Sequence, residues 1–222
     1  MISNKEYENY KIRIFLVRHG QPVQHSGKIF LGQADIPLSE QGRAEAEHAG
    51  ERLIELNARP MRIYTSDLAR ARETAEIISG KLGGITVVPD LLFREMAMGS
   101  WDGELIEDIK VKFPEEYAKR GDDPRNYRTP GGENFYDLKA RVTREFHRIF
   151  AEDFRGAESP DAGDLVIVAH LGVISILAEE LSSAGDSGIA EHAFGGAGDS
   201  FWNGGFATGS ATVIDAPDWL LG

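Results

Sequence analysis

The sequence predicts an α/β fold, a three-layer α/β/α sandwich built on a mostly parallel central sheet. Apolar runs of strand type alternate along the chain with segments of helical periodicity, and one run is apolar throughout, as in strands that helices cover on both faces. A chain of 222 residues with 41% hydrophobic content can bury one large core. We therefore expect residues 1–222 to form a single domain.

The first strand and the first helix follow from patterns near the N-terminus. Residues 12–17 form a short apolar run, which ends abruptly in Arg18 and His19. Ser39 has a side chain typical of a helix N-cap. After it, apolar side chains recur on one helical face at Ala46, Ala49, Leu53 and Leu56.

The next segments continue the alternation. Residues 62–65 are predicted to form a second strand, Ser66 to cap a helix that continues to Leu82, and residues 85–88 to form a third strand. An acidic section with several glycines follows, and its pattern indicates no further element.

The second half of the chain begins with a break at Pro130, Gly131 and Gly132. A long helix is expected after it, with apolar positions at Phe135, Leu138, Val142, Phe146 and Ile149. Residues 165–169 are the run that is apolar throughout, and it ends at His170. This strand is expected to be covered on both faces.

The C-terminal part is predicted to contain a helix over residues 173–181 and a last strand over residues 211–214. A segment rich in Gly, Ser and Ala lies between them, from Ser182 to about Gly198. It is either a connection or a loop near a functional site.

The charge of the chain argues against two classes of partner. Lys and Arg number 24 against 36 Asp and Glu, and the net charge of -12 repels nucleic acid and anionic membranes. We expect neither as a partner. An anionic substrate therefore needs a local basic pocket, which makes the position of each arginine informative.

Cysteine is absent, which excludes thiol nucleophiles, disulfides and thiolate zinc sites and fits a reducing cytoplasm. The first residues lack the apolar stretch of a signal peptide, and no apolar run is long enough to span a bilayer. We expect a soluble, cytoplasmic protein, with a monomer and a homodimer both open.

Charged or nucleophilic side chains follow three of the predicted strands. Arg18 and His19 follow the first, residues 66–70 the second, and His170 the strand that ends at Ala169. In open α/β sheets, ligands bind beyond the carboxyl ends of the strands. A lone histidine is more often structural than catalytic, so the prediction of one shared site depends on this convergence.

Six blocks of sequence between residues 12 and 178 carry a more specific signal. They are Leu16-Val17-Arg18-His19-Gly20-Gln21 and residues 32–42, 64–75, 94–103, 130–133 and 168–172. In content and order they resemble the histidine phosphatase (phosphoglycerate mutase-like) superfamily, with a general likeness to its α-ribazole phosphatase and fructose-2,6-bisphosphatase-like branch. The resemblance implies a phosphoglycerate mutase-like fold.

The resemblance also implies roles for five residues. His19 would be the nucleophile that takes the phosphoryl group, while its other ring nitrogen donates to a backbone carbonyl of its own turn. Arg18 and Arg70 would bind phosphate oxygens, because a guanidinium stays charged and its planar fork can bind two oxygens. His170 would add a hydrogen bond and a positive charge. Glu95 would protonate the leaving oxygen and then take a proton from water.

Four further residues are candidates for substrate contacts, namely His25, Gly32, Gln33 and Leu171. His25 lies where the mutases of the family usually carry Asn. Its loop either contacts the substrate or is simply exposed to solvent. No metal and no cofactor are implied, since arginines supply the charge that a metal would otherwise provide.

Three functions are compatible with a phosphate-binding pocket of this kind. The prediction is hydrolysis of a small phosphorylated metabolite, a phosphomonoester, through phosphohistidine on His19. The alternative is a cofactor-dependent phosphoglycerate mutase, but such mutases carry a basic insert for the substrate carboxylate, whereas residues 104–128 are rich in acids and lack paired arginines. A catalytically inactive module that binds a phosphate ligand would not need the whole set of five residues.

Overall fold

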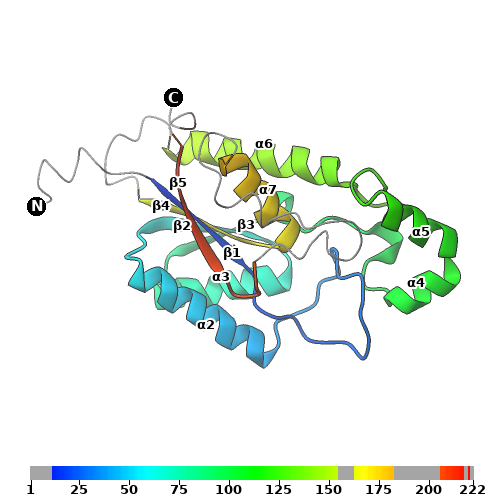
Figure 1. The fold of residues 1–222 in the computed structure, drawn as a ribbon. Helices are drawn as coiled ribbons and strands as arrows, with labels where there is room; N and C mark the ends of the chain where they lie inside the picture. Colours follow the sequence, from blue (N-terminus) through cyan, green and yellow to red (C-terminus); the bar gives the residue numbers. More distant parts are fainter. Residues whose placement is uncertain (1–11, 155–162, 183–205, 218–219, 221–222) are drawn as a thin grey trace, which may run out of the picture.

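The computed structural model describes residues 12–154, 163–182, 206–217 and 220. Within these residues, five strands form one sheet in the order β3-β2-β4-β1-β5. All neighbouring strands are parallel except β1 and β5, which pair antiparallel. Helices cover both faces of the sheet (Figure 1). The predicted α/β fold with a mostly parallel sheet is therefore confirmed.

The strands lie close to the predicted apolar runs. Their bounds are Arg13–Arg18 for β1, Pro60–Ser66 for β2, Thr86–Asp90 for β3, Asp164–Ala169 for β4 and Ala211–Asp215 for β5. All positions of β4 are buried, and it lies in the middle of the sheet between β2 and β1. This position explains why its sequence shows no polar alternation.

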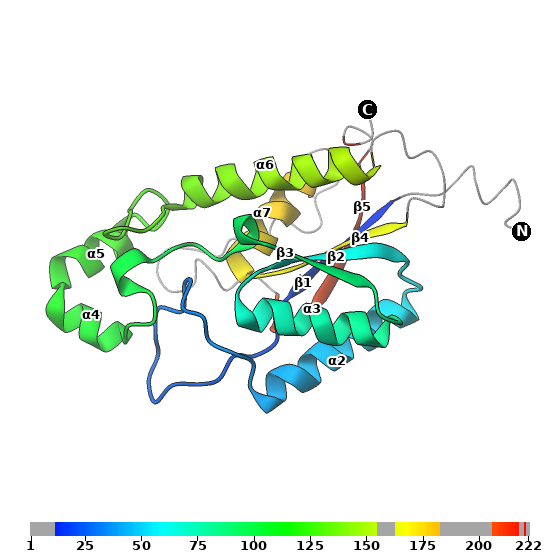
Figure 2. The same ribbon diagram turned by 180° about the vertical axis from the view of Figure 1, so that it is seen from behind.

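Two pairs of helices cover the sheet. On one face lie α2 (Glu40–Glu55) and α3 (Ala69–Lys81), and on the other lie α6 (Phe135–Phe154) and α7 (Leu171–Ser182), as the two opposite views show (Figures 1 and 2). The start of α2 is as predicted, because the Ser39 hydroxyl accepts a hydrogen bond of 3.0 Å from the Gly42 amide.

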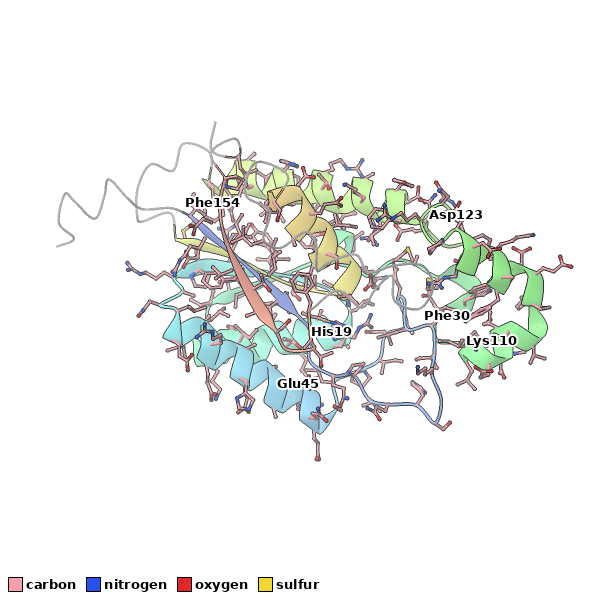
Figure 3. The ribbon with its side chains drawn as sticks, viewed as in Figure 1. His19, Phe30, Glu45, Lys110, Asp123 and Phe154 are labelled. Carbon is pink, nitrogen blue, oxygen red and sulfur yellow. The ribbon has the colours of Figure 1, made fainter. Side chains whose placement is uncertain are left out.

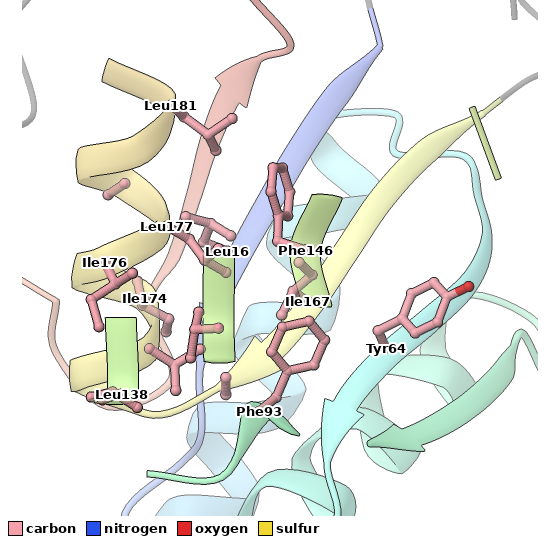
Figure 4. Packing of buried hydrophobic residues seen from close by; sticks show 14 of the residues in the cluster. Leu16, Tyr64, Phe93, Leu138, Phe146, Ile167, Ile174, Ile176, Leu177 and Leu181 are labelled. Carbon is pink, nitrogen blue, oxygen red and sulfur yellow. The ribbon is translucent and has the colours of Figure 1, made fainter. Parts of the chain in front are cut away.

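Alternate side chains of each strand point into opposite layers. In β1, Val17 belongs to a buried cluster that includes Leu53 of α2. Leu16 points to the other face, where it belongs to the cluster of Phe146 from α6 and Leu177 from α7 (Figure 4). The sheet thus has an apolar core on both faces. The polar residues that follow the strands lie at the edge of the sheet formed by the carboxyl ends of the strands.

The predicted start of α3 is wrong. Ser66 is the last residue of β2, where it pairs with Asp90, and the N-cap of α3 is Leu68, which offers no side-chain cap. The cap comes from elsewhere, because the Ala69 amide donates a hydrogen bond of 2.6 Å to the Asp35 carboxylate. A partner distant in sequence therefore sets the start of this helix.

The acidic middle section contains two helices that the sequence pattern does not indicate, α4 (Ile106–Lys112) and α5 (Pro114–Asp122). Ile109 is the only buried residue of α4, and α5 buries none, so neither has a clear apolar face. Both carry acidic residues in the first turn and basic residues in the last, which favours helices through the dipole.

Two short 3-10 helices, η1 (Leu91–Phe93) and η2 (Gly99–Trp101), complete the described chain between β3 and α4. The Gly-rich segment expected from Ser182 to about Gly198 lies outside the described residues, apart from Ser182 itself. In the described ranges, no helix has both the length and the apolar character that a membrane span needs.

Candidate active site

The two candidate histidines follow neighbouring strands. Arg18 of β1 pairs in parallel register with Ala169 of β4, so His19 and His170 leave the sheet side by side. The His19 amide donates a hydrogen bond of 2.9 Å to the Ala169 carbonyl, and the two imidazole centroids are 5.0 Å apart. The predicted convergence at the carboxyl edge therefore holds for both histidines.

Arg70 reaches the same edge from the first turn of α3, which follows β2. Its side chain is fully buried, and its Nε donates to His19 Nε2 over 3.3 Å. Its two terminal nitrogens donate to backbone carbonyls of the loop after β1, Gly32 and Ala34. Burial lowers the pKa of Arg70 to about 10, so the guanidinium still carries its charge at neutral pH.

The hydrogen bonds of His19 define which ring nitrogen can react. Nδ1 lies 2.7 Å from the Gly20 carbonyl, and since a carbonyl only accepts, Nδ1 must carry the proton. This is the contact within its own turn that the sequence analysis expects. Burial, reinforced by the charge of Arg70, lowers the pKa of His19 well below its usual value. The ring is therefore neutral, and Nε2 carries the electron pair that accepts the hydrogen bond from Arg70 Nε.

Three buried nitrogen atoms at this edge lack a hydrogen-bond partner among the described residues. They are Nε of Arg18 and both ring nitrogens of His170. Arg18 is anchored by another atom, Nη1, which donates to the Phe206 carbonyl over 2.7 Å. A buried polar group without a partner costs roughly 1–3 kcal/mol, so the Arg18 Nε–H and the single N–H of a neutral His170 ring are available to an acceptor such as a phosphate oxygen.

The charge of His170 differs from the expectation. Burial, then the charge of Arg70, lowers the pKa of His170 well below the usual value for histidine, so the protein by itself holds this ring neutral. A positive charge on His170 requires an anion beside it, because only an added negative charge offsets these two effects.

Glu95 approaches the site from the segment after η1. Its carboxylate accepts a hydrogen bond of 2.8 Å from the Met96 amide and one of 3.1 Å from the Gly172 amide. Gly172 is the second residue of α7, and amides in a first helical turn have no partner within the helix and favour negative charge. The side chain is thus held between two backbone segments and lines the same pocket as His19.

The backbone of Glu95 is clamped as well. Its carbonyl accepts hydrogen bonds of 2.9 Å from both Arg141 Nη2 and Gln33 Nε2. Arg141, on α6, also donates to the Leu92 carbonyl over 2.7 Å and forms a two-bond ion pair with Glu133. Through these hydrogen bonds of Arg141, helix α6 fixes the position of the backbone segment that carries Glu95.

A cavity of about 290 Å³ opens at this edge of the sheet. Its lining consists of Arg18, His19, Ile29, Phe30, Leu31, Gly32, Arg70, Glu95, Met96, Met98, Arg120 and Leu171. Figure 3 shows His19 near the end of β1 and Phe30 further toward α4 and α5. Gly32 and Leu171 are thus at the cavity, as the sequence analysis expects of substrate contacts.

The other two expected substrate contacts lie elsewhere. His25 is exposed and lines a groove formed by residues 21–29 and 31, not the cavity of His19. The Gln33 side chain donates to the Glu95 carbonyl, and the Gln33 backbone amide donates to the Asp102 carboxylate. Gln33 therefore positions the segment that carries Glu95 and does not line the cavity. The local sequence does not distinguish these two positions from Gly32, because the path of the loop decides which residues turn inward.

A family model described as the histidine phosphatase superfamily (branch 1) matches residues 14–201. The chain belongs to this superfamily. It is 33% identical over 192 residues to glucosyl-3-phosphoglycerate phosphatase of Mycobacterium tuberculosis, covering 86% of this chain and 83% of the relative. It is 36% identical over 131 residues to the 2,3-bisphosphoglycerate-dependent phosphoglycerate mutase of Brucella ovis, covering 58% of this chain and 64% of the relative.

The fold of this superfamily member matches solved structures over most of its length. The α-ribazole phosphatase of Shigella flexneri superimposes with a TM-score of 0.74 at 24% identity, covering 93% of this chain and 92% of that one. At this level of identity the likeness supports the fold, and the chemistry has to be argued from the site itself.

Sequence reasoning missed the part of the cavity formed by Phe30, Met96, Met98 and Arg120. The first three are apolar residues that a sequence cannot distinguish from core, and each is at most 9% exposed. Arg120 lies on α5, where the guanidinium carbon is 5.1 Å from the centroid of the Phe30 ring. The sequence does not indicate that Arg120 lines the cavity, because the folded α5 brings it there.

Proposed function

We propose that the protein is a phosphomonoesterase that hydrolyses a small phosphorylated metabolite through a phosphohistidine on His19. The observation that carries this proposal is the pair of contacts made by the His19 ring. Nδ1 is held as a donor by the Gly20 carbonyl, and Nε2 keeps its electron pair at a cavity that also contains Arg18 and Arg70. A neutral, oriented imidazole among fixed cations is what attack on a phosphate ester requires.

The first step transfers the phosphoryl group. The phosphate oxygens bind Arg18, Arg70 and His170, and the Arg70 Nε–H turns from His19 to the substrate. His19 Nε2 then forms a bond to phosphorus while the bond from phosphorus to the ester oxygen breaks. The protonated carboxyl of Glu95 gives its proton to that oxygen, which leaves as the alcohol.

The second step returns the enzyme to its starting state. A water oxygen bonds to phosphorus, the bond between Nε2 and phosphorus breaks, and the Glu95 carboxylate takes the proton from the water. Inorganic phosphate leaves with a net uptake of one water per ester. Because Glu95 acts as acid and then as base, it ends protonated as it began.

Phosphoglycerate mutase is the second candidate, which the match to the Brucella ovis enzyme favours. A mutase has to retain the phosphoenzyme and to bind the carboxylate of its substrate. Among the described residues, α4 and α5 contribute one arginine to the cavity, Arg120. Conversion of 3-phosphoglycerate to 2-phosphoglycerate faster than release of inorganic phosphate would favour the mutase.

The test of the proposed function is turnover of an aryl phosphate. We expect hydrolysis to persist in excess chelator, because arginines supply the positive charge, and to be inhibited by vanadate, which imitates five-coordinate phosphorus. Complete loss on chelation, with recovery on added metal, would overturn the metal-independent mechanism. We also propose a cytoplasmic location, which the absence of cysteine supports.

A further inference from the structure

The residues that line the cavity form two groups of different chemistry. Arg18, His19 and Arg70 line one part, and together with His170, whose ring centroid is 5.0 Å from that of His19, we name them the phosphate end. Glu95 is the acidic residue of the lining. The apolar side chains of the lining, which we name the leaving-group wall, are those of Ile29, Phe30, Leu31, Met96, Met98 and Leu171, and Gly32 and Arg120 complete the lining. The part of a substrate beyond its phosphate would lie against this wall.

The leaving-group wall is held in place by its surroundings. The Phe30 ring packs against Trp101, with centroids 5.2 Å apart, and against Tyr117 at 6.4 Å. The Phe30 backbone is fixed at both ends, since its amide donates to the Glu104 carbonyl and its own carbonyl accepts from the Gly103 amide. A wall with fixed backbone and packed rings is formed before any substrate arrives, which lowers the entropy cost of binding.

Arg120 also lines the cavity, and its guanidinium carbon lies over the Phe30 ring, 5.1 Å from the ring centroid. Because Phe30 is covered in this way and is only 9% exposed, the wall offers apolar contact from several side chains and not one stacking surface.

We propose that the substrates are phosphate monoesters of apolar alcohols and not of polyhydroxylated sugars. This proposal rests on the proposed phosphohydrolase function. Burial of methylene or ring carbons against Phe30 and Met98 is favourable, whereas each sugar hydroxyl placed there gives up a hydrogen bond to water without gaining one from a side chain. One such unpaired hydroxyl reduces affinity roughly tenfold or more.

The test compares two esters of the same shape and leaving-group type. Glucose 6-phosphate and cyclohexylmethyl phosphate both carry the phosphate on an exocyclic methylene of a six-membered ring. We expect kcat/KM to be at least about tenfold higher for cyclohexylmethyl phosphate, mainly through KM. A higher or equal kcat/KM for glucose 6-phosphate would overturn the proposal, whereas hydrolysis of neither ester nor of an aryl phosphate would contradict the proposed function itself.

A substitution then localises the preference. Met98→Gln keeps the length of the side chain and adds polar atoms to the wall, so the preference for the cyclohexylmethyl ester should fall by roughly tenfold. Phe113→Ser is the control, since Phe113 is 48% exposed and does not line the cavity. Arg120→Gln provides a second variant, which removes the guanidinium that lies over the Phe30 ring. An unchanged preference in both Met98→Gln and Arg120→Gln would show that the wall does not select the leaving group.

Discussion

The phosphate end and the leaving-group wall are built in different ways. His19, Arg70 and His170 follow three strands of one sheet, so the backbone pairing that forms the sheet also places them together. Phe30 and Met98 come from loops, and Arg120 from an exposed helix. The difference indicates that the phosphoryl chemistry is tied to the stability of the sheet, whereas the choice of leaving group can change with the loops alone.

The largest predicted effect is at the phosphate end. His170→Ala removes a buried ring N–H that would bind a phosphoryl oxygen, so kcat should fall by roughly a hundredfold or more. Slow phosphorylation of His19 should remain detectable, because its attacking nitrogen is untouched. Rapid-quench kinetics with an aryl phosphate measures both quantities. A fall of less than threefold would assign His170 to the core.

Glu95→Gln tests the proposed proton donor, which lines the same cavity. The variant cannot donate a proton, so hydrolysis of alkyl phosphates should slow by about a hundredfold and that of aryl phosphates by much less, since good leaving groups need little protonation. A series of esters with graded leaving groups measures the difference. An equal loss across the series would make Glu95 structural.

Arg70→Lys keeps the charge and loses the planar fork. The rate should fall by at least about tenfold, because a lysine cannot reach His19 and the phosphate oxygens in the same geometry. Arg72→Lys is the control, because Arg72 is exposed and pairs with Glu76 on the surface of α3. Equal effects on kcat/KM at the two positions would mean that Arg70 does not bind the phosphate.

The smallest predicted effect concerns the clamp behind Glu95. Arg141→Gln removes the ion pair with Glu133 and the bond to the Glu95 carbonyl, and a displaced Glu95 should slow alkyl esters by roughly tenfold, with aryl esters less affected. Arg144→Gln, on the exposed side of the same helix, is the control. A loss that is uniform across leaving groups would indicate general damage to the fold instead of a displaced acid.

The same contrast explains what could be predicted from the sequence. The phosphate end could be predicted because apolar runs mark the strands, and residues just beyond their carboxyl ends meet at one edge. The start of α3 could not, since its capping group, Asp35, is 34 residues distant. The role of Gln33 could not be predicted either, because it depends on tertiary structure: only the folded loop brings the Gln33 side-chain amide to the Glu95 carbonyl.

The leaving-group wall is the part that sequence patterns cannot indicate. Phe30 and Met98 are buried apolar residues, and nothing local separates a cavity wall from a core position. The α4 and α5 helices, which bring Arg120 to the cavity, bury one side chain between them and so lack the periodicity that marks a helix.

The central claim is that His19 carries the phosphoryl group, and trapping this adduct tests it most directly. Denaturation during turnover, followed by peptide mapping under alkaline conditions, should place a base-stable, acid-labile phosphate on the peptide that contains His19. Adduct formation should persist to a lower pH than the ordinary pKa of histidine would allow, because burial and the charge of Arg70 lower the pKa of His19. His19→Ala should abolish adduct and activity together. An adduct on His170, or full activity in His19→Ala, would contradict the account.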